Sequence, residues 1–425
     1  MIRCALPFPS SPRCHLGKHG NHRLLTSLSS ASGGDPSAAD RVIRKFVASS
    51  SRTASLEALS LLLSRRLSSF ALPMYMRMSE TAWFRWNPKL ASDVVANLEA
   101  GGRSTEADAL ISSSVVDLAP KEIALFHRHL IRAYSEHGLS HRALEVFSRL
   151  KEISGGAVDA ASYEAMICGL CVLGLPREAE LLREEMFSAG FKPSGFVFRS
   201  VVMTYGRSGS FGEMWRVVGI MEDSGHALDT VGANIVLSCY GDHGELPEMV
   251  SWLWKMRDSG IKFSVRTYNS VLNSCPTIGS MLRDPGTAPQ SIGELIMELE
   301  KAPSPAEVEL VQELVKSSVL DGILKWSPSE VKLDLHGLHL GSVYVILLQW
   351  LDMLRDRLCS TEGGCVPLEV TVVCGSGKHS SVRGQSSVKG LVSEMMFKLS
   401  SPLRIDRNNV GRFIAKGKVV KEWLC

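Results

Sequence analysis

The feature that most constrains the fold is a repeat of 35 residues in the middle of the chain. Four kinds of position recur in phase at this spacing. They are Gly209, Gly244 and Gly279; Met186, Met221 and Met256; Gly190, Gly225 and Gly260; and Tyr163, Phe198 and Tyr268, with Ala233 in the missing place. Apolar residues between them recur at helical spacing, so each unit is predicted to be two helices joined by glycine turns. One helix pair cannot bury its apolar face alone, and we therefore expect an all-α helical-repeat solenoid with a long concave surface.

The repeat tract is predicted to span residues 88–280. Its clear units are 124–159, 160–194, 195–229 and 230–264, followed by a partial unit, 265–280, and preceded by a degenerate one, 88–123. After Gly279, the run Arg283-Asp284-Pro285-Gly286 breaks the helical pattern, so the solenoid is expected to end there. Residues 301–330 are predicted to form a short helical bridge.

From Val331 the apolar period changes to two. Val331, Leu333 and Leu335 alternate with Lys332, Asp334 and His336, which predicts a strand on which Asp334 and His336 point the same way. A helix over 340–358 and an apolar strand over 368–373 follow. This βαβ order makes the strands parallel, so their carboxyl ends share one edge, next to the loop Cys374-Gly375-Ser376-Gly377-Lys378. With two short strands over 404–406 and 412–415, residues 331–425 are predicted to be a small two-layer α/β domain.

The C-terminal region is also where positive charge is concentrated. Residues 375–425 contain ten basic and three acidic side chains, a net of +7, whereas residues 124–264 carry 14 basic and 17 acidic ones, a net of −3. Glycines let backbone N–H groups approach a phosphate, and a helix beginning near Ser386 or Ser387 adds its positive end. We therefore expect nucleic-acid contacts here. The predicted contact residues are Gly375, Ser376, Gly377, Lys378, Ser380, Arg383, Arg412, Lys416 and Lys418.

The N-terminal segment has the composition of a targeting sequence. The first 34 residues contain Arg3, Arg13, Lys18 and Arg23 but no acidic residue, and they are rich in Ser, Leu and Pro. Residues 1–40 are therefore predicted to be a transit peptide for the chloroplast, with the mitochondrion as the alternative. No apolar run reaches the roughly 18 residues of a spanning helix, so no membrane span is expected.

The ten cysteines are scattered along the chain, and we expect reduced thiols. Cys168 and Cys171 form a CxxC sequence that could be a redox or metal-binding pair. No second CxxC or His pair accompanies it, so packing is the preferred interpretation.

Several short segments of the repeats resemble the pentatricopeptide consensus. They are Ser162-Tyr163, Gly169-Leu170-Cys171, Glu185-Met186 and Gly190-Phe191-Lys192-Pro193. The resemblance implies that the fifth and last residues of each unit read single-stranded RNA, about one nucleotide per repeat. These pairs are Arg128 with Asp159, Glu164 with Ser194, Arg199 with Asp229, and Asn234 with Ser264; Asn269 holds the fifth position of the partial unit. Only Asn234 and Ser264 are both small and polar, as base reading requires, whereas Arg and Glu fit poorly.

The sequence Leu333-Asp334-Leu335-His336-Gly337, together with the glycine loop, is similar to the Smr domain of MutS-related and some plant pentatricopeptide proteins. Several members of that family cleave DNA or RNA. The resemblance implies catalytic roles for Asp334 and His336, with Asp334 also able to hold Mg²⁺. Cys374 stands where the family has His or Thr, which counts against cleavage.

The sequence thus predicts an all-α solenoid followed by a small α/β Smr domain, in a protein that binds single-stranded organelle RNA. Its expected role is in RNA processing, stability or translation. Two alternatives stay open. One is an endonuclease that uses Asp334 and His336, and the other is a scaffold whose solenoid binds protein while only the Smr domain contacts nucleic acid.

Overall fold

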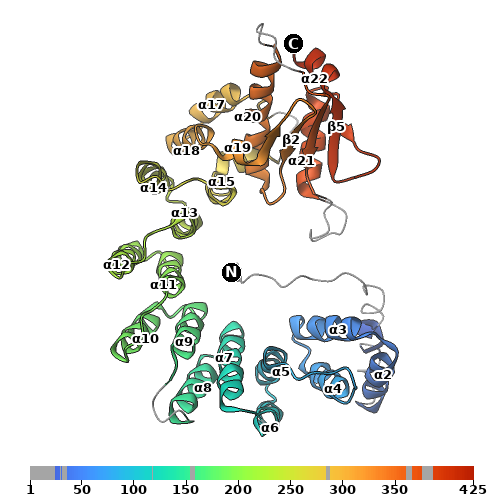
Figure 1. The fold of residues 1–425 in the computed structure, drawn as a ribbon, viewed down its shortest axis with the longest axis vertical. Coiled ribbons are helices and arrows are strands. Elements are labelled where there is room, and N and C mark those ends of the chain that lie inside the picture. Colours follow the sequence, from blue (N-terminus) through green and yellow to red (C-terminus); the bar gives the residue numbers. More distant parts are fainter. Residues whose placement is uncertain are drawn as a thin grey trace. The chain divides into compact units, whose positions relative to one another are not determined.

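The computed structural model describes residues 24–28, 30, 36–116, 118–153, 158–283, 288–359, 366–375 and 386–425. Figure 1 shows the helices and strands along the chain. The chain divides into two compact units, residues 1–204 and 205–425. The division falls inside helix α11 (Gly195–Arg207) and therefore within the predicted repeat tract. Most of the predicted transit peptide lies outside the described residues.

The N-terminal unit is made of helices. They are α2 (Pro36–Ser49), α3 (Arg52–Ser64), α4 (Ser68–Ser79), α5 (Pro88–Ala100), α6 (Ser104–Val115), α7 (Pro120–Glu136), α8 (Ser140–Ile153), α9 (Ala160–Val172), α10 (Pro176–Ser188) and the first part of α11. Helix α7 packs against α5, α8 and α9, and α9 packs against α10. Each helix pair therefore shares its core with the next, as a solenoid requires.

Glycines end the first helix of successive pairs. Gly138 and Gly174 have φ of 76° and 75°, a left-handed conformation that costs residues with a Cβ more than glycine. The next residue closes the turn, since the N–H of Leu139 donates to the Tyr134 carbonyl oxygen at 2.9 Å. Gly209 and Gly244 of the periodic series have the same conformation, with φ of 72° and 74°, and end helices in the same way. Gly279 does not, because it lies inside helix α16 (Pro276–Met281).

Helices also form most of the C-terminal unit before its sheet. They are α12 (Phe211–Asp223), α13 (Thr230–His243), α14 (Leu246–Asp258), α15 (Val265–Leu272), α16 (Pro276–Met281), α17 (Ile292–Glu300), α18 (Pro305–Val315) and α19 (Val319–Ile323). Helix α18 packs against α14, α15 and α17. Arg257 pairs with Glu313 at 2.9 Å, and the Tyr268 hydroxyl donates to the Leu314 carbonyl oxygen at 2.6 Å. Helices beyond Gly279 therefore pack on the last repeats, although the sequence predicted that the solenoid ends there.

A five-stranded sheet completes the C-terminal unit, in the order β1-β2-β3-β5-β4. Its strands are β1 (Leu324–Trp326), β2 (Glu330–Asp334), β3 (Glu369–Val373), β4 (Arg404–Ile405) and β5 (Arg412–Lys416). Strands β2 and β3 are parallel, which confirms the predicted pairing, and the other pairs are antiparallel. The prediction of a helical bridge over 301–330 is wrong at its end, because Leu324–Trp326 pairs with Val331–Leu333.

Helix α20 (Leu340–Cys359) joins β2 to β3 and is buried on nearly every side. It packs against α15 and α17 and also against α21 (Ser387–Lys398) and α22 (Gly417–Leu424). A helix with neighbours all round needs apolar residues on every face, and Val343, Val345, Ile346 and Leu348, which point in different directions around the helix, are completely buried. Repeat helices and sheet helices therefore share one core in this unit.

Cys359 and Cys425 form a disulfide, so the expectation of reduced thiols is wrong for this pair. Helix α22 packs against α20 and brings the two Cα atoms within 5.6 Å, although the residues are 66 positions apart. Cys168 and Cys171 are not bonded to each other, and burial raises their pKa values to about 11 and about 12. These two thiols are therefore protonated at neutral pH.

None of the helices that the structure describes is both long and apolar enough to cross a lipid bilayer.

Candidate nucleic-acid interface

A hollow of about 310 Å³ lies on the first helices of the predicted units in the N-terminal unit. Arg128 on α7 and Glu164 on α9 line it, so the structure brings together the fifth positions of two consecutive units. Leu125 and Phe196, which are second in their units, also line it and are 38% and 49% exposed. The hollow thus combines the predicted reading positions with an exposed aromatic ring.

Phe196 is a residue that the sequence reasoning missed. It lies at the start of α11, at the second position of its unit, whereas base reading was assigned to the fifth and last positions. The signal was available, because an aromatic residue at the second position of a unit falls on the same helix face as the fifth position. An exposed ring of this kind can stack on a base without selecting its sequence.

The predicted reading residues of the first two clear units contact each other. Arg128 Nη1 pairs with Asp159 Oδ2 at 3.0 Å, and Glu164 Oε1 accepts from the Ser194 backbone N–H at 3.2 Å. Asp159 also caps α9 by accepting from the Ser162 N–H at 2.9 Å. Burial opposes its ionisation, but the hydrogen bonds from Ser162 and the charge of Arg128 outweigh this effect and lower the pKa of Asp159. This carboxylate stays ionised and paired with Arg128.

The pair Asn234 and Ser264 is also internally bonded. Asn234 Nδ2 donates to Ser264 Oγ at 3.2 Å, and Asn234 Oδ1 accepts from the Thr267 hydroxyl at 2.8 Å. Asn234 is 3% exposed. Its amide must therefore exchange these partners to contact a base.

Arg199 and Asp229 fall on different sides of the division between the two units. Within the C-terminal unit, Asp229 caps helix α13 by accepting from the Gly232 N–H at 2.8 Å.

Asn269 has a different environment from the other fifth-position residues. Its Nδ2 donates to the Gly337 carbonyl oxygen at 2.9 Å, and its Oδ1 accepts from the His339 N–H at 2.8 Å. The side chain is 9% exposed and joins α15 to the turn after β2. Both ends of the amide are occupied by the protein itself, which counts against its predicted role in base reading.

Arg132 and His129 on α7 also line the hollow. Arg132 pairs with Asp93 at 2.5 Å and with Glu136 at 2.6 Å, so its charge is balanced within the protein. His129 has its pKa lowered, first by burial and then by the charge of Arg132. Its imidazole is therefore predominantly neutral at pH 7, and this hollow carries little net positive charge.

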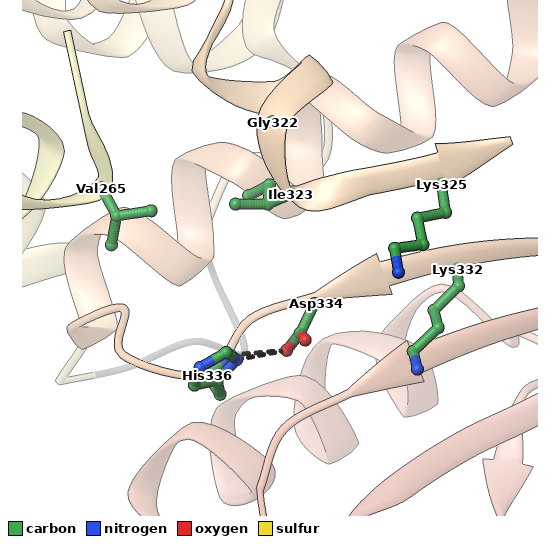
Figure 2. A pocket seen from close by; sticks show the side chains of 7 residues that line it. All are labelled: Val265, Gly322, Ile323, Lys325, Lys332, Asp334 and His336. Carbon is green, nitrogen blue, oxygen red and sulfur yellow. Dashed lines mark hydrogen bonds and ion pairs between the residues drawn. The ribbon is translucent and has the colours of Figure 1, made fainter.

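A second pocket, of about 370 Å³, lies in the C-terminal unit beside the end of β2 (Figure 2). Val265, Gly322, Ile323, Lys325, Lys332, Asp334 and His336 line it. His336 Nδ1 lies 2.8 Å from Asp334 Oδ1, which also accepts from the His336 backbone N–H at 3.1 Å. Because the carboxylate can only accept, Nδ1 carries the proton, and in the neutral ring Nε2 is then the acceptor. The imidazole is 78% exposed, so Nε2 is open to a ligand.

Lys325 and Lys332 were not among the predicted site residues. They are directly opposite each other on β1 and β2, and Figure 2 shows both side chains extending toward the same side of the sheet. Within the described ranges neither lysine has an ion-pair partner. Like charges directly opposite are unfavourable unless an anion lies between them. Lys332 could have been found from its alternation with Asp334, but Lys325 lies in the segment predicted to be helical.

The register of the sheet separates the other predicted contacts into two groups. Asp334 pairs with Val373, and Val373 pairs with Arg412, so Arg412 lies at the same edge as the pocket. Lys416 pairs with Glu369, and both lie four residues, or about 13 Å, along their strands from the pair of Arg412 and Val373. Lys418, the second residue of α22, lies at that far edge as well. Lys416 and Lys418 are therefore separated from Asp334.

Arg412 is engaged within the protein. Its Nε pairs with Asp406 Oδ2 at 2.5 Å. The Asn408 backbone N–H and the Arg412 guanidinium lower the pKa of Asp406, which keeps this partner ionised.

The glycine loop is described only at its beginning. Gly375 has φ of 76°, as a sharp turn after β3 requires. Ser376, Gly377, Lys378, Ser380 and Arg383 lie outside the described residues.

Cys374 is buried beside this loop. Burial raises the pKa of its thiol to about 12, although Lys389 in the first turn of α21 acts in the opposite direction. Cys374 therefore remains a neutral thiol at neutral pH and cannot act as a base. In the part of the chain that the structure describes, no three His, Cys, Asp or Glu side chains are grouped so as to hold a metal ion.

Comparison with known proteins identifies the repeats. The family model for the PPR repeat matches residues 128–154, 161–191 and 233–261, each inside one predicted unit. A pentatricopeptide repeat-containing protein of Arabidopsis thaliana is 49% identical over 422 residues, 96% of this chain and 82% of the relative. The chain belongs to the pentatricopeptide repeat family. The resemblance seen in the repeats is thereby confirmed, and so is the helical-repeat solenoid.

Other pentatricopeptide repeat proteins are similar over shorter stretches. A chloroplastic one of Zea mays is 24% identical over 63% of this chain and 39% of its own length, and a mitochondrial one of Arabidopsis thaliana is 28% identical over 28% of this chain and 11% of its own. Among solved structures, maize PPR10 has a TM-score of 0.43 at 16% identity. That match covers 89% of this chain and 59% of PPR10.

Proposed function

We propose that this pentatricopeptide repeat protein binds single-stranded RNA in a plant organelle and acts in RNA processing, stability or translation. The observation that carries the proposal is the hollow formed by Arg128, Glu164 and Phe196. It combines side chains able to meet the edge of a base with an exposed ring able to stack on its face. Because the fifth-position side chains are already bonded to their partners, we expect stacking to contribute more than sequence reading.

The experiment is equilibrium binding of the full chain to a labelled single-stranded RNA of random sequence. Phe196→Ala is expected to weaken binding by about 1–3 kcal/mol, the range for loss of one stacked base. Phe187→Ala is the matched control, because Phe187 is 63% exposed but lies on α10, the second helix of its pair. Equal effects of the two changes would refute the proposal. No RNA binding by the wild type would favour the scaffold alternative.

The proposed organelle is the chloroplast, with the mitochondrion as the alternative. The acid-free N-terminal segment supports import into an organelle. One of the similar proteins is chloroplastic and another is mitochondrial. A fluorescent protein carrying residues 1–40 would be imported by the correct organelle and excluded from the other.

The pocket around Asp334 and His336 supports a second function. We propose that residues 331–425 are an Smr domain and that this pocket binds the RNA backbone. Lys325 and Lys332 add two charges without partners in the described ranges, and the net charge of +7 over 375–425 adds to the attraction for phosphate.

RNA cleavage at this pocket is the alternative, and the exposed imidazole of His336 is the observation that supports it. His336 Nε2 would take the proton of a ribose 2′-hydroxyl, and the 2′-oxygen would attack the adjacent phosphorus. The bond from phosphorus to the 5′-oxygen would then break, and water would supply the proton for that oxygen. Lys325 and Lys332 would balance the charge on phosphorus.

Strand length and end chemistry test cleavage separately from binding. Cleavage predicts 2′,3′-cyclic phosphate ends with the wild type and none with His336→Ala, and an RNA with 2′-methoxy groups would stay intact. If the RNA stays intact with the wild type, cleavage is refuted and binding remains the proposed function of this pocket. Unchanged RNA affinity in a Lys325→Gln, Lys332→Gln variant would refute the binding role.

A further inference from the structure

A third hollow, of about 290 Å³, lies in the N-terminal unit ahead of the clear repeats. It forms where the segment that joins α4 to α5 meets the beginnings of α3 and α5. Trp83, Arg85 and Trp86 come from the joining segment, Arg52 from α3 and Lys89 from α5. We call it the N-terminal aromatic hollow.

The charge of this hollow is positive and largely unbalanced. No described residue pairs with Arg52 or Lys89, and Arg85 donates only to the carbonyl oxygens of Ala82 and Phe84. The one carboxylate in the lining, Asp93, is already paired with Arg132.

Two helix ends increase this positive potential. Arg52 is the first residue of α3 and Lys89 the second of α5, and neither helix has an acidic residue in its first turn. Cations are unfavourable at the positive end of a helix dipole. This arrangement does not stabilise the fold by itself, whereas a bound anion would be stabilised by it.

Aromatic rings provide the other half of the site. Trp83 is half-buried in the lining, and Phe84 beside it packs edge-on against Tyr75, with ring centres 5.7 Å apart. Trp86 is held edge-on against Phe126, also at 5.7 Å. Its indole Nε1 has no hydrogen-bond partner among the residues that are described. Rings fixed by packing offer a stacking surface at little cost in conformational freedom.

We propose that the N-terminal aromatic hollow binds one nucleotide of single-stranded RNA, with the base stacked on Trp83 and the phosphates among Arg52, Arg85 and Lys89. The inference rests on the proposed RNA binding and adds a contact outside the clear repeats. RNA is favoured over an acidic peptide because it supplies a flat π surface together with a fixed negative charge, and the hollow has a complement to both.

The test measures binding of the full chain to a labelled single-stranded RNA of random sequence at several salt concentrations. Trp83→Ala is expected to weaken binding about tenfold, and Trp83→Phe to retain most of it. The double variant Arg52→Gln, Lys89→Gln is expected to reduce the slope of log K against log salt by up to about 1.4, or about 0.7 for each lost phosphate contact.

Matched controls separate a local contact from a general effect. Arg65→Gln removes an exposed charge from the other end of α3, and Trp254→Ala removes an exposed tryptophan from the C-terminal unit. Both are expected to bind as the wild type does, and thermal melts check that every variant is folded.

The outcomes distinguish this inference from the proposed function. If the wild type binds RNA and both the Trp83→Ala and the double variant bind equally well, the hollow is not a nucleotide site, while the proposed function stands. If the wild type does not bind, both are overturned. If Trp83→Ala does not fold, the double variant decides, and an unchanged salt slope would overturn the inference.

Discussion

Asn269 offers a direct test of whether a fifth-position residue reads RNA or holds the protein together. Its side chain makes two hydrogen bonds to the turn after β2, at 2.9 Å to Gly337 and 2.8 Å to His339, and is 9% exposed. A hydrogen bond contributes about 0.5–1.5 kcal/mol net, so Asn269→Ala should lower the free energy of unfolding by about 1–3 kcal/mol. RNA affinity should be unchanged under conditions where the variant is folded.

The assay is urea unfolding of the full chain, together with hydrogen exchange of peptides from α15 and α20. Faster exchange is expected in both helices, because the lost bonds fasten α15 to the turn that leads into α20. Asn269→Asp places a carboxylate oxygen against the Gly337 carbonyl oxygen at a nearly buried site, so its loss of stability should be at least as large as that of Asn269→Ala. Asn273→Ala is the matched control, since among the described residues the Asn273 side chain hydrogen-bonds only to the exposed ring of His339, and its loss should cost less than about 0.5 kcal/mol.

The reasoning fails if Asn269→Ala unfolds like Asn273→Ala. It also fails if the variant keeps its stability but loses RNA affinity, because Asn269 would then read a base as its position in the repeat first suggested.

Three further predictions concern the cysteines and histidines. Cys359→Ser should lower the free energy of unfolding by about 2–4 kcal/mol in urea, with no further loss on adding a reductant. Cys374, with a pKa of about 12, should be labelled by maleimide at pH 8 only after unfolding, because about one thiol in ten thousand is ionised; fast labelling of the native protein would contradict its burial. Burial lowers the pKa of His127 on α7 below 6.5, so the unfolded chain takes up the proton first; stability should be complete above pH 6.5 and fall as the pH drops below it. A thermal melt at pH 7.5 and pH 5.5 checks this, and His127→Gln should reduce the difference.

The repeats and the parallel strand pair could be predicted because both follow from short-range periods. The spacing of glycines and apolar residues marks helix stops such as Gly138 and Gly174, and alternation from Val331 to His336 marks β2. Strand β1 could not be predicted, since three residues are too few to show a period and helices precede them. For that reason the predicted site did not include Lys325.

The disulfide and the role of Asn269 depend on contacts between residues far apart in the sequence. Cys359 and Cys425 meet only because α22 packs on α20, and Asn269 meets Gly337 only because α15 packs beside the turn after β2. Neither contact leaves a periodic signal. Conversely, Asp334 and His336 were predicted to lie near the start of the glycine loop, and the pairing of Asp334 with Val373 supports this.

The packing of α18 against α14 and α15 has a practical consequence for dissecting the chain. Arg257 and Tyr268 in the repeats take partners at Glu313 and Leu314, beyond the end that the sequence assigned to the solenoid. A protein truncated near residue 280 would lose the layer that covers these helices and present fresh apolar surface to water. Loss of RNA affinity after such a cut would report aggregation as readily as a missing domain, so point substitutions are the cleaner way to assign roles to the repeats and the sheet.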